Sequence, residues 1–154
     1  SLIEKVKNNP WSYHYIAAIE IFKKKPFVGH GIKSFRVKCG ETKIQQETVK
    51  LPHKYKNYKA CFTHPHNYMF EFLSEFGLIG FLFYFGLIII IFYQTIIMMR
   101  HESKNDRIIF FGISALILSV LFPFKPSGSF LTTFNASIFF YLLGFFIHYL
   151  EKNK

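Results

Sequence analysis

Charged residues are absent from three long stretches of this sequence. Residues 76–99 and 108–124 carry no charge, and residues 127–150 contain only Asn135 and His148 as strongly polar side chains. Helices without a polar face cannot meet water on one side, which excludes the surface helices of an ordinary soluble domain. A run of 24 residues extends about 36 Å, enough to cross a hydrocarbon core of about 30 Å. We therefore expect an all-α integral membrane protein with these three runs as spans.

A secretory leader is not recognisable either. The first five residues include no apolar stretch and no initiator methionine. Three helices alone would also leave their lipid-facing surfaces without packing partners. We expect the chain to be the C-terminal part of a larger, multi-pass protein with further spans upstream.

Acidic residues are scarce, with 9 Asp and Glu against 19 Lys and Arg. Residues 1–65 hold 13 of the basic residues against 4 acidic ones, a net charge of +9, whereas residues 66–154 hold 6 against 5. The sequence thus predicts two parts, a basic polar segment at 1–65 and a membrane domain at 66–154.

The short basic loops suggest how the chain crosses the membrane. Residues 99–107 and the tail 151–154 carry Lys and Arg beside a span, so both are expected in the cytoplasm. Residues 1–65 then lie on the opposite, periplasmic side of a bacterial inner membrane. Nucleic acid is an improbable partner for a basic segment placed there.

Within the polar segment, apolar residues at helical spacing predict a helix over 11–22. The lysines and proline at 23–26 should end it. A glycine-flanked turn at 27–32 and a short piece at 34–37 follow, and residues 40–60 are expected to form a loop. The two cysteines, Cys39 and Cys61, could form a disulfide outside the cytoplasm or remain free thiols, and the sequence leaves both open.

One pattern joins the two parts of the chain. His66-Asn67 is followed by nine residues and then by Gly77-Leu78-Ile79-Gly80. Upstream, Pro26-Phe27-Val28-Gly29-His30-Gly31 is followed four residues later by Phe35. Together with Cys39 and Thr63-His64-Pro65 before the first pattern, these motifs resemble the O-antigen ligase and O-antigen polymerase superfamily of bacterial membrane proteins. The resemblance covers the last large periplasmic loop and the final three spans.

The resemblance implies a multi-spanning, GT-C-like glycosyltransferase. Such an enzyme moves a glycan from an undecaprenyl diphosphate carrier to an acceptor hydroxyl at the periplasmic face, without a metal ion or other cofactor. The acceptor is lipid A–core in ligases and a second lipid-linked repeat unit in polymerases. Relatives often place an arginine near the start of the first helix of the loop, where this sequence has Trp11 with His14 nearby.

Histidine supplies the expected base. A neutral imidazole, with an ordinary pKa of about 6.5, can take a proton from a sugar hydroxyl. His66 is the first candidate for this role, and a histidine that merely caps a helix or lies at the interface is the alternative. His64 is expected to position substrate. Pro65 between them suits the first turn of a helix that starts near His66.

The helix after His66 carries a polar stripe. Asn67, Glu71, Ser74 and Glu75 share one face at helical spacing. We expect this face to line a wet groove for the acceptor sugar, or else to pair with lysine or arginine of the polar segment. Glycines in the same helix should let another helix approach closely, namely Gly77 and Gly80.

A departing diphosphate needs positive charge. Arg36 is the arginine of the polar segment and follows the turn at Gly29 and Gly31, whose backbone N–H groups could also face an anion. We expect Arg36 to bind the diphosphate, helped by Lys33 and Lys38. A solvated surface arginine is the alternative.

Two other kinds of protein fit parts of the sequence. Cys61, His64 and His66, with Cys39 or His53, offer zinc-ligand types, although their spacing is unusual and no CxxC pair occurs. A non-enzymatic membrane module could instead bind anionic lipids through its basic head, with the lysines at 23–25 as the main contacts.

Overall fold

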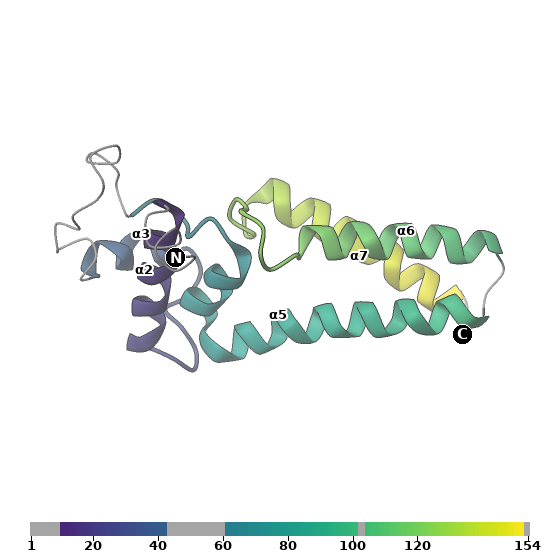
Figure 1. The fold of residues 1–154 in the computed structure, drawn as a ribbon, viewed down its shortest axis with the longest axis horizontal. Helices are drawn as coiled ribbons and strands as arrows, with labels where there is room; N and C mark the ends of the chain where they lie inside the picture. The colour runs from purple at the N-terminus through teal and green to yellow at the C-terminus, as the bar shows by residue number, and fades with distance from the viewer. Residues whose placement is uncertain (1–9, 43–60, 102–103, 153–154) are drawn as a thin grey trace, which may run out of the picture. The chain divides into compact units, whose positions relative to one another are not determined.

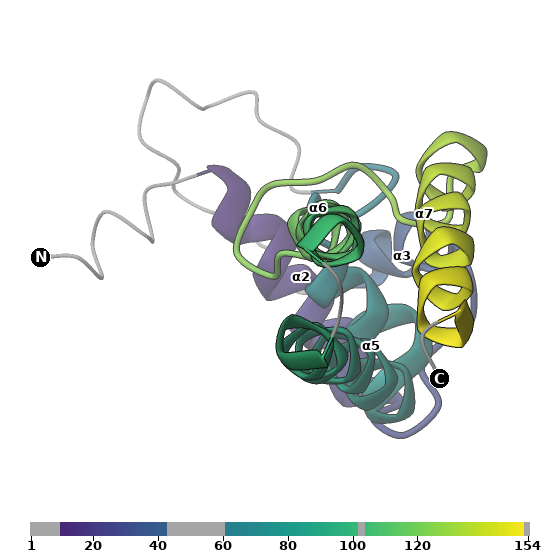
Figure 2. The same ribbon diagram turned by 90° about the vertical axis from the view of Figure 1, so that its right-hand side faces the viewer.

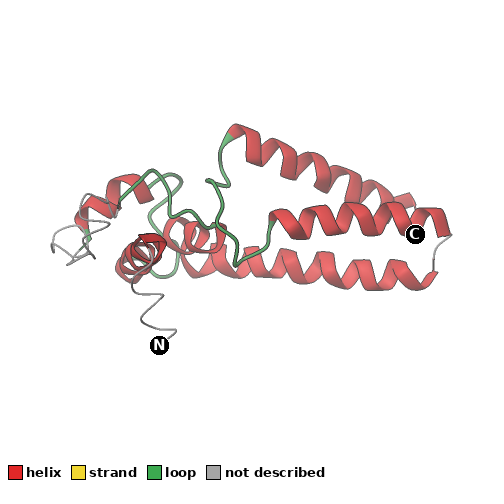
Figure 3. Ribbon diagram, turned by 45° about the horizontal axis from the view of Figure 1, so that its top comes forward, coloured by secondary structure: helices red, strands yellow, loops and turns green. Residues whose placement is uncertain are grey.

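The computed structural model describes residues 10–42, 61–101 and 104–152. The described part of the chain is helical and contains no strand (Figure 3). Most of the loop expected at 40–60 lies outside the described residues. Contacts divide the chain into two compact units, with the first reaching to Leu82 and also including Phe124–Phe130.

The first unit, here called the head unit, is built on α2 (Pro10–Lys24), α3 (Phe35–Lys38), the 3-10 helix η1 (Cys39–Glu41) and the first turns of α5 (Tyr68–His101) (Figure 1). Proline at the first position suits a helix start, because its missing N–H would have no partner there. Lysines occupy the last turn, where their positive charge interacts favourably with the negative end of the helix dipole. His30 lies near that end, and its Nε2 is 3.1 Å from the Ile21 carbonyl oxygen.

A small core holds the head unit together. Its buried side chains come from α2, α3 and η1, and partly buried Cys61 and Phe70 pack against them: Ala17, Ala18, Ile21, Phe35 and Cys39. Cys39 and Cys61 form a disulfide, with their Cα atoms 5.6 Å apart. Of the two possibilities that the sequence left open, the structure has the disulfide. The bond ties the residues just before α5 to this core.

Helix α5 is interrupted at Gly77, which has the non-helical angles φ 66° and ψ −156°. Such a break deprives the next N–H groups of their helical acceptors. Carbonyl groups of the loop between α2 and α3 take the place of those acceptors. Leu78 N donates to Pro26 O at 2.7 Å, and Ile79 N donates to Phe27 O at 3.2 Å. The glycine-flanked turn expected at 27–32 is therefore bonded to the break in α5.

The second unit contains the later part of α5 with α6 (Lys104–Val120) and α7 (Thr133–Lys152). Figure 2 shows α6 end-on and α7 inclined to it. Phe110 and Phe146 join these two helices, with ring centroids 4.9 Å apart. At one end Lys152 Nζ bonds Asp106 at 3.1 Å, and Tyr84 of α5 donates its hydroxyl to Leu121 O.

Two of the described helices are long and apolar enough to cross a membrane, by length and composition: Tyr68–Arg100 and Thr133–Lys152. Helix α6 has 17 residues, so a third span stays a prediction. It ends at Val120 and not at 124 because Pro123 follows, and proline disfavours helix at the residue before it. Helix α7 starts at Thr133 and not at 127, since Thr132 Oγ1 accepts the Asn135 N–H at 3.4 Å as a helix cap.

Candidate functional site

His66 lies in a strained turn immediately before α5. Its φ is 56°, a left-handed conformation that is uncommon outside glycine. The helix begins two residues later than the sequence suggested, because Asn67 caps it: Asn67 Oδ1 accepts the Phe70 N–H at 3.2 Å. His66 is thus set on a turn and not on the helix, with its ring half-buried.

The turn is fastened from the other side by the segment between α6 and α7. Ser127 N donates to His66 O at 2.9 Å, and Asn67 Nδ2 donates to Lys125 O at 3.2 Å. Both polar groups of the Asn67 amide therefore bind backbone, and the side chain is buried. In the described residues Asn67 acts as a structural residue, whereas the sequence pointed to substrate contact.

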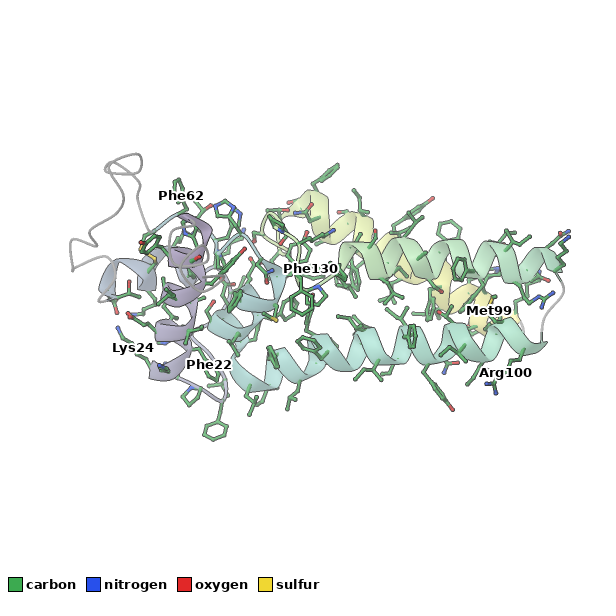
Figure 4. The ribbon with its side chains drawn as sticks, viewed as in Figure 1. Phe22, Lys24, Phe62, Met99, Arg100 and Phe130 are labelled. Carbon is green, nitrogen blue, oxygen red and sulfur yellow. A yellow bond between two sulfur atoms is a disulfide. The ribbon has the colours of Figure 1, made fainter. Side chains whose placement is uncertain are left out.

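Three histidines and one phenylalanine gather around this turn. The His66 ring centroid lies 4.2 Å from that of His64, 5.1 Å from that of His14 and 5.9 Å from that of Phe62. His14 is completely buried, while Phe62, which is labelled in Figure 4, is 46% exposed. The sequence indicated His64 and His66 as a pair, but Phe62 was missed, and nothing in its local pattern marks it.

Burial lowers the pKa of His66 below its ordinary value. The pKa of His64 is lowered as well, mainly by burial and further by the charge of His66. Both rings are therefore neutral near pH 7, which is the form in which an imidazole accepts a proton. His64 Nδ1 lies 2.9 Å from Thr63 Oγ1, which orients that ring.

The expected polar stripe is buried and bonded within the head unit. Glu71 accepts hydrogen bonds from the Ser129 hydroxyl and from Phe130 N, the latter at 2.7 Å. The Phe130 ring packs against Tyr68 and Phe72, with centroids 5.3 Å from each (Figure 4). Glu71 thus holds the segment at 129–130 against the first turns of α5.

Glu75 does the same for the segment before α3. Its two carboxylate oxygens accept the Lys33 N–H at 2.7 Å and the Phe35 N–H at 3.3 Å. Arg36 follows directly, on the exposed side of α3. The positive charges of Arg36 and Lys33 attract the negative carboxylate of Glu75. Lys38, the third expected cation, pairs with Glu41 at 2.8 Å.

These contacts correct the expectation of a wet groove along this face. Glu71 and Glu75 are 2% and 1% exposed, and Ser74 is fully buried with its hydroxyl donating to Phe70 O at 2.9 Å. The carboxylates bind backbone N–H groups and a hydroxyl, not lysine or arginine side chains. A buried carboxylate is stable only when its oxygens are hydrogen-bonded in this way.

The glycines also act differently from the expectation. A loop, not a helix, approaches Gly77: a Cβ atom there would lie 2.6 Å from Gly29 N. Gly80 accommodates the Phe76 side chain of its own helix at the bend. Gly29 N and Gly31 N donate to Lys25 O and Glu75 O at 3.1 and 2.8 Å. Those two N–H groups therefore face protein carbonyls and not an anion.

The structure leaves no thiol for the zinc site that the sequence offered. Cys39 and Cys61 are bonded to each other, and a disulfide sulfur is not the thiolate that zinc requires. His53 lies outside the described residues.

The site residues thus form two groups along the start of α5. Histidines and Phe62 surround the turn at His66, and Glu75 with Lys33 and Arg36 lies farther along the helix. Tyr68 and Glu75 are seven positions apart on the helix, a rise of about 10 Å. The histidine group therefore lies just before α5, and the start of α3, with Lys33 and Arg36, is bonded to α5 through Glu75.

No curated protein and no solved structure matches the chain. Residues 11–85 match a family model described as O-antigen ligase. This match covers the His66 turn, the Glu75 group and the disulfide. Members of this family are membrane proteins with O-antigen ligase or polymerase activity on lipid-linked glycans. The segment 11–85, which carries both groups of the site, belongs to the O-antigen ligase family.

Proposed function

We propose that the protein of which this chain is part transfers a glycan from undecaprenyl diphosphate to an acceptor sugar hydroxyl at the periplasmic face of the inner membrane. The acceptor is either lipid A–core or a second lipid-linked repeat unit. The head unit lies on the periplasmic side in this proposal, and the C-terminus lies in the cytoplasm. The observation that carries it is the half-buried His66, on a turn held by the Ser127 N–H and by the Asn67 cap, beside the exposed ring of Phe62.

In the proposed step, an imidazole nitrogen of His66 takes the proton of the acceptor hydroxyl. The hydroxyl oxygen forms a bond to the anomeric carbon as the bond from that carbon to the diphosphate oxygen breaks, with inversion. The electron pair leaves with the lipid diphosphate. No metal ion is required, because the leaving group is stabilised by Arg36 and Lys33.

Several contacts support these roles. Phe62 offers an exposed ring face next to His66, and C–H groups of a sugar pack well on such a face. Glu75 fixes the start of α3 through the Lys33 and Phe35 N–H groups. Glu75 thereby positions Arg36 through the backbone on either side of Ser34. The contacts described above use backbone N–H groups and not the Arg36 side chain.

The decisive experiment compares His66→Ala with His148→Ala, a change at an exposed histidine of α7. Transfer from a lipid-linked donor is measured in membranes that contain the complete protein at equal abundance. Losing a general base typically costs about 10²–10⁴ in rate, so His66→Ala should lose that much and His148→Ala almost nothing. Near-normal transfer by His66→Ala would remove His66 from this role.

The same assay separates the enzyme from the non-enzymatic membrane module. A lipid-binding head predicts loss of function when Lys23, Lys24 and Lys25 are changed to Gln, with His66→Ala harmless. The enzyme predicts the opposite order. Surface polysaccharide on a gel then divides the two branches: loss of all core-attached chains indicates a ligase, and capping by one repeat unit indicates a polymerase.

A further inference from the structure

The loop that is bonded to the break in α5 exposes large apolar side chains to its surroundings. Phe27 is 68% exposed and Val28 is 66% exposed, although both are apolar. Adjacent exposed apolar side chains of this size are costly in water. A surface of this kind marks an interaction site.

The loop is fixed where the long apolar part of α5 begins. Its carbonyls at Pro26 and Phe27 accept the Leu78 and Ile79 N–H groups at 2.7 and 3.2 Å. Its backbone at Gly29 touches Gly77 so closely that no Cβ fits between them. Phe27 and Val28 are therefore held at the level at which α5 starts its uncharged run.

The α5 side chains at this level are exposed and apolar too. Ile79 is 62% exposed and Leu82 is 60% exposed, and both belong to a helix apolar enough to cross a membrane. The exposed apolar surface of the loop thus lies beside the exposed apolar surface of α5, at the same position along the helix axis. A medium that surrounds Ile79 and Leu82 at this level is therefore within reach of Phe27 and Val28, whose carbonyl neighbours bind the same turn of α5.

Cations lie next to the loop on the chain. Lys23 in the last turn of α2 and Lys25 just after the helix are exposed, and Lys24 Nζ donates to Glu41 O at 3.2 Å. Figure 4 shows Phe22 and Lys24 at this end of α2. Lysine followed by a large apolar residue is the order expected where phosphate headgroups meet acyl chains.

We propose that the loop at 26–28 is a membrane-interface anchor, with Phe27 and Val28 inserted into the lipid bilayer beside α5. The occupant of this surface is lipid, not another protein segment. The anchor goes beyond glycan transfer and does not depend on the role of His66. It would hold the head unit at a fixed height relative to the headgroups.

The test uses nitroxide labels on single cysteines in the complete protein, reconstituted into phosphatidylglycerol–phosphatidylcholine vesicles. Phe27→Cys and Val28→Cys are the test positions. Leu82→Cys is the lipid-exposed control, and Val37→Cys on α3 is a control of similar exposure, 64%. The native disulfide keeps Cys39 and Cys61 unlabelled. Collision rates with oxygen, which concentrates in lipid, and with a water-soluble nickel chelate are measured by power saturation.

We expect oxygen to exceed the nickel chelate at Phe27→Cys, Val28→Cys and Leu82→Cys, and the reverse at Val37→Cys. Collision with nickel at positions 27 and 28 as frequent as at position 37 would place the loop in water and overturn the proposal. Protection from both reagents at 27 and 28 would show that protein covers the loop, which also overturns it. Transfer activity is not part of this readout, so a failure here is separate from failure of the proposed reaction.

Discussion

Gly29 and Gly77 lie with their backbones in direct contact: a Cβ atom on either residue would lie 2.6 Å from the amide nitrogen of the other. Both have positive φ, 67° and 66°. The contact explains why the two sequence motifs that contain these glycines occur together. One motif forms the loop, and the other forms the break in α5 that receives it.

A series of alanine substitutions tests this contact. Gly29→Ala and Gly77→Ala combine a left-handed backbone with a steric clash, so each should destabilise the protein by more than the about 1–2 kcal/mol of the backbone term alone. Gly31 also has positive φ, but there is open space around it. Gly31→Ala should therefore lose only the stability that the left-handed backbone costs an alanine. The measurement is the melting temperature in detergent.

Gly40 is the control for this series. It has no positive φ and nothing within 4 Å of its would-be Cβ, so Gly40→Ala should leave the melting temperature nearly unchanged. If Gly77→Ala were as mild as Gly40→Ala, the close contact with the loop would not exist in solution.

The two buried carboxylates give a second prediction. Glu71→Ala and Glu75→Ala each remove the carboxylate that accepts two hydrogen bonds, and losing the acceptor of one buried donor costs about 1–3 kcal/mol. Both variants should therefore lower the melting temperature clearly. Glutamine keeps one oxygen acceptor and turns an amide toward the other donor, so the Gln variants should be intermediate.

Glu41→Ala is the matched control for the two glutamates. Glu41 is an exposed carboxylate paired with Lys38, and exposed ion pairs contribute little to stability. Equal melting temperatures for Glu41→Ala and Glu75→Ala would contradict the anchoring role. An unchanged transfer rate for Glu75→Gln would argue that Glu75 does not position Arg36 for stabilising the leaving group.

The long helices and the site motifs were readable from the sequence, but the backbone around them was not. Uncharged runs predict α5 and α7 because no polar face is present. By contrast, the positive φ of His66 and of Gly77 arises from contacts with residues 127 and 27–29. Local propensity carries no information on such distant partners.

The polar stripe shows the same limit in another form. Helical spacing correctly put Glu71 and Glu75 on one face. It could not show that N–H groups of two remote loops would cover that face, since those donors belong to Lys33, Phe35 and Phe130. Periodicity identifies a face, whereas burial depends on what packs there.

The histidine pair predicts a pH dependence in both activity and stability. Because burial lowers the pKa of His66 below 6.5, the ring stays neutral in mildly acidic solution. Transfer should therefore persist below pH 6.5 and fall only as pH drops through the lowered value. A rate that falls already above pH 7 on acidification would indicate another base.

The lowered pKa values of the two histidines also make the stability of the folded protein depend on pH. The unfolded chain binds protons more readily than the folded His64 and His66, whose pKa values are both lowered. Unfolding is therefore favoured by protonation, and stability rises with pH through the window just below 6.5 and levels off above it. His64→Gln should flatten part of that slope in a series of melting curves.

The disulfide between Cys39 and Cys61 should matter for both folding and the site. The cysteines are 22 residues apart, and closing a loop of that length stabilises by about 3 kcal/mol in the chain-entropy model. Cys61 directly precedes Phe62, whose ring contacts His66. Reduction should therefore loosen the turn as well as lower the melting temperature.

The measurement is a melting curve and a transfer rate, each with and without dithiothreitol. Wild type should lose stability and activity with the reductant, because the residues before α5 are then held to the head core by packing alone. The double variant Cys39→Ala, Cys61→Ala should start at the reduced values and show no further response. Wild-type curves that coincide with and without full reduction would show that packing of Phe70 and the α2 core alone holds this turn.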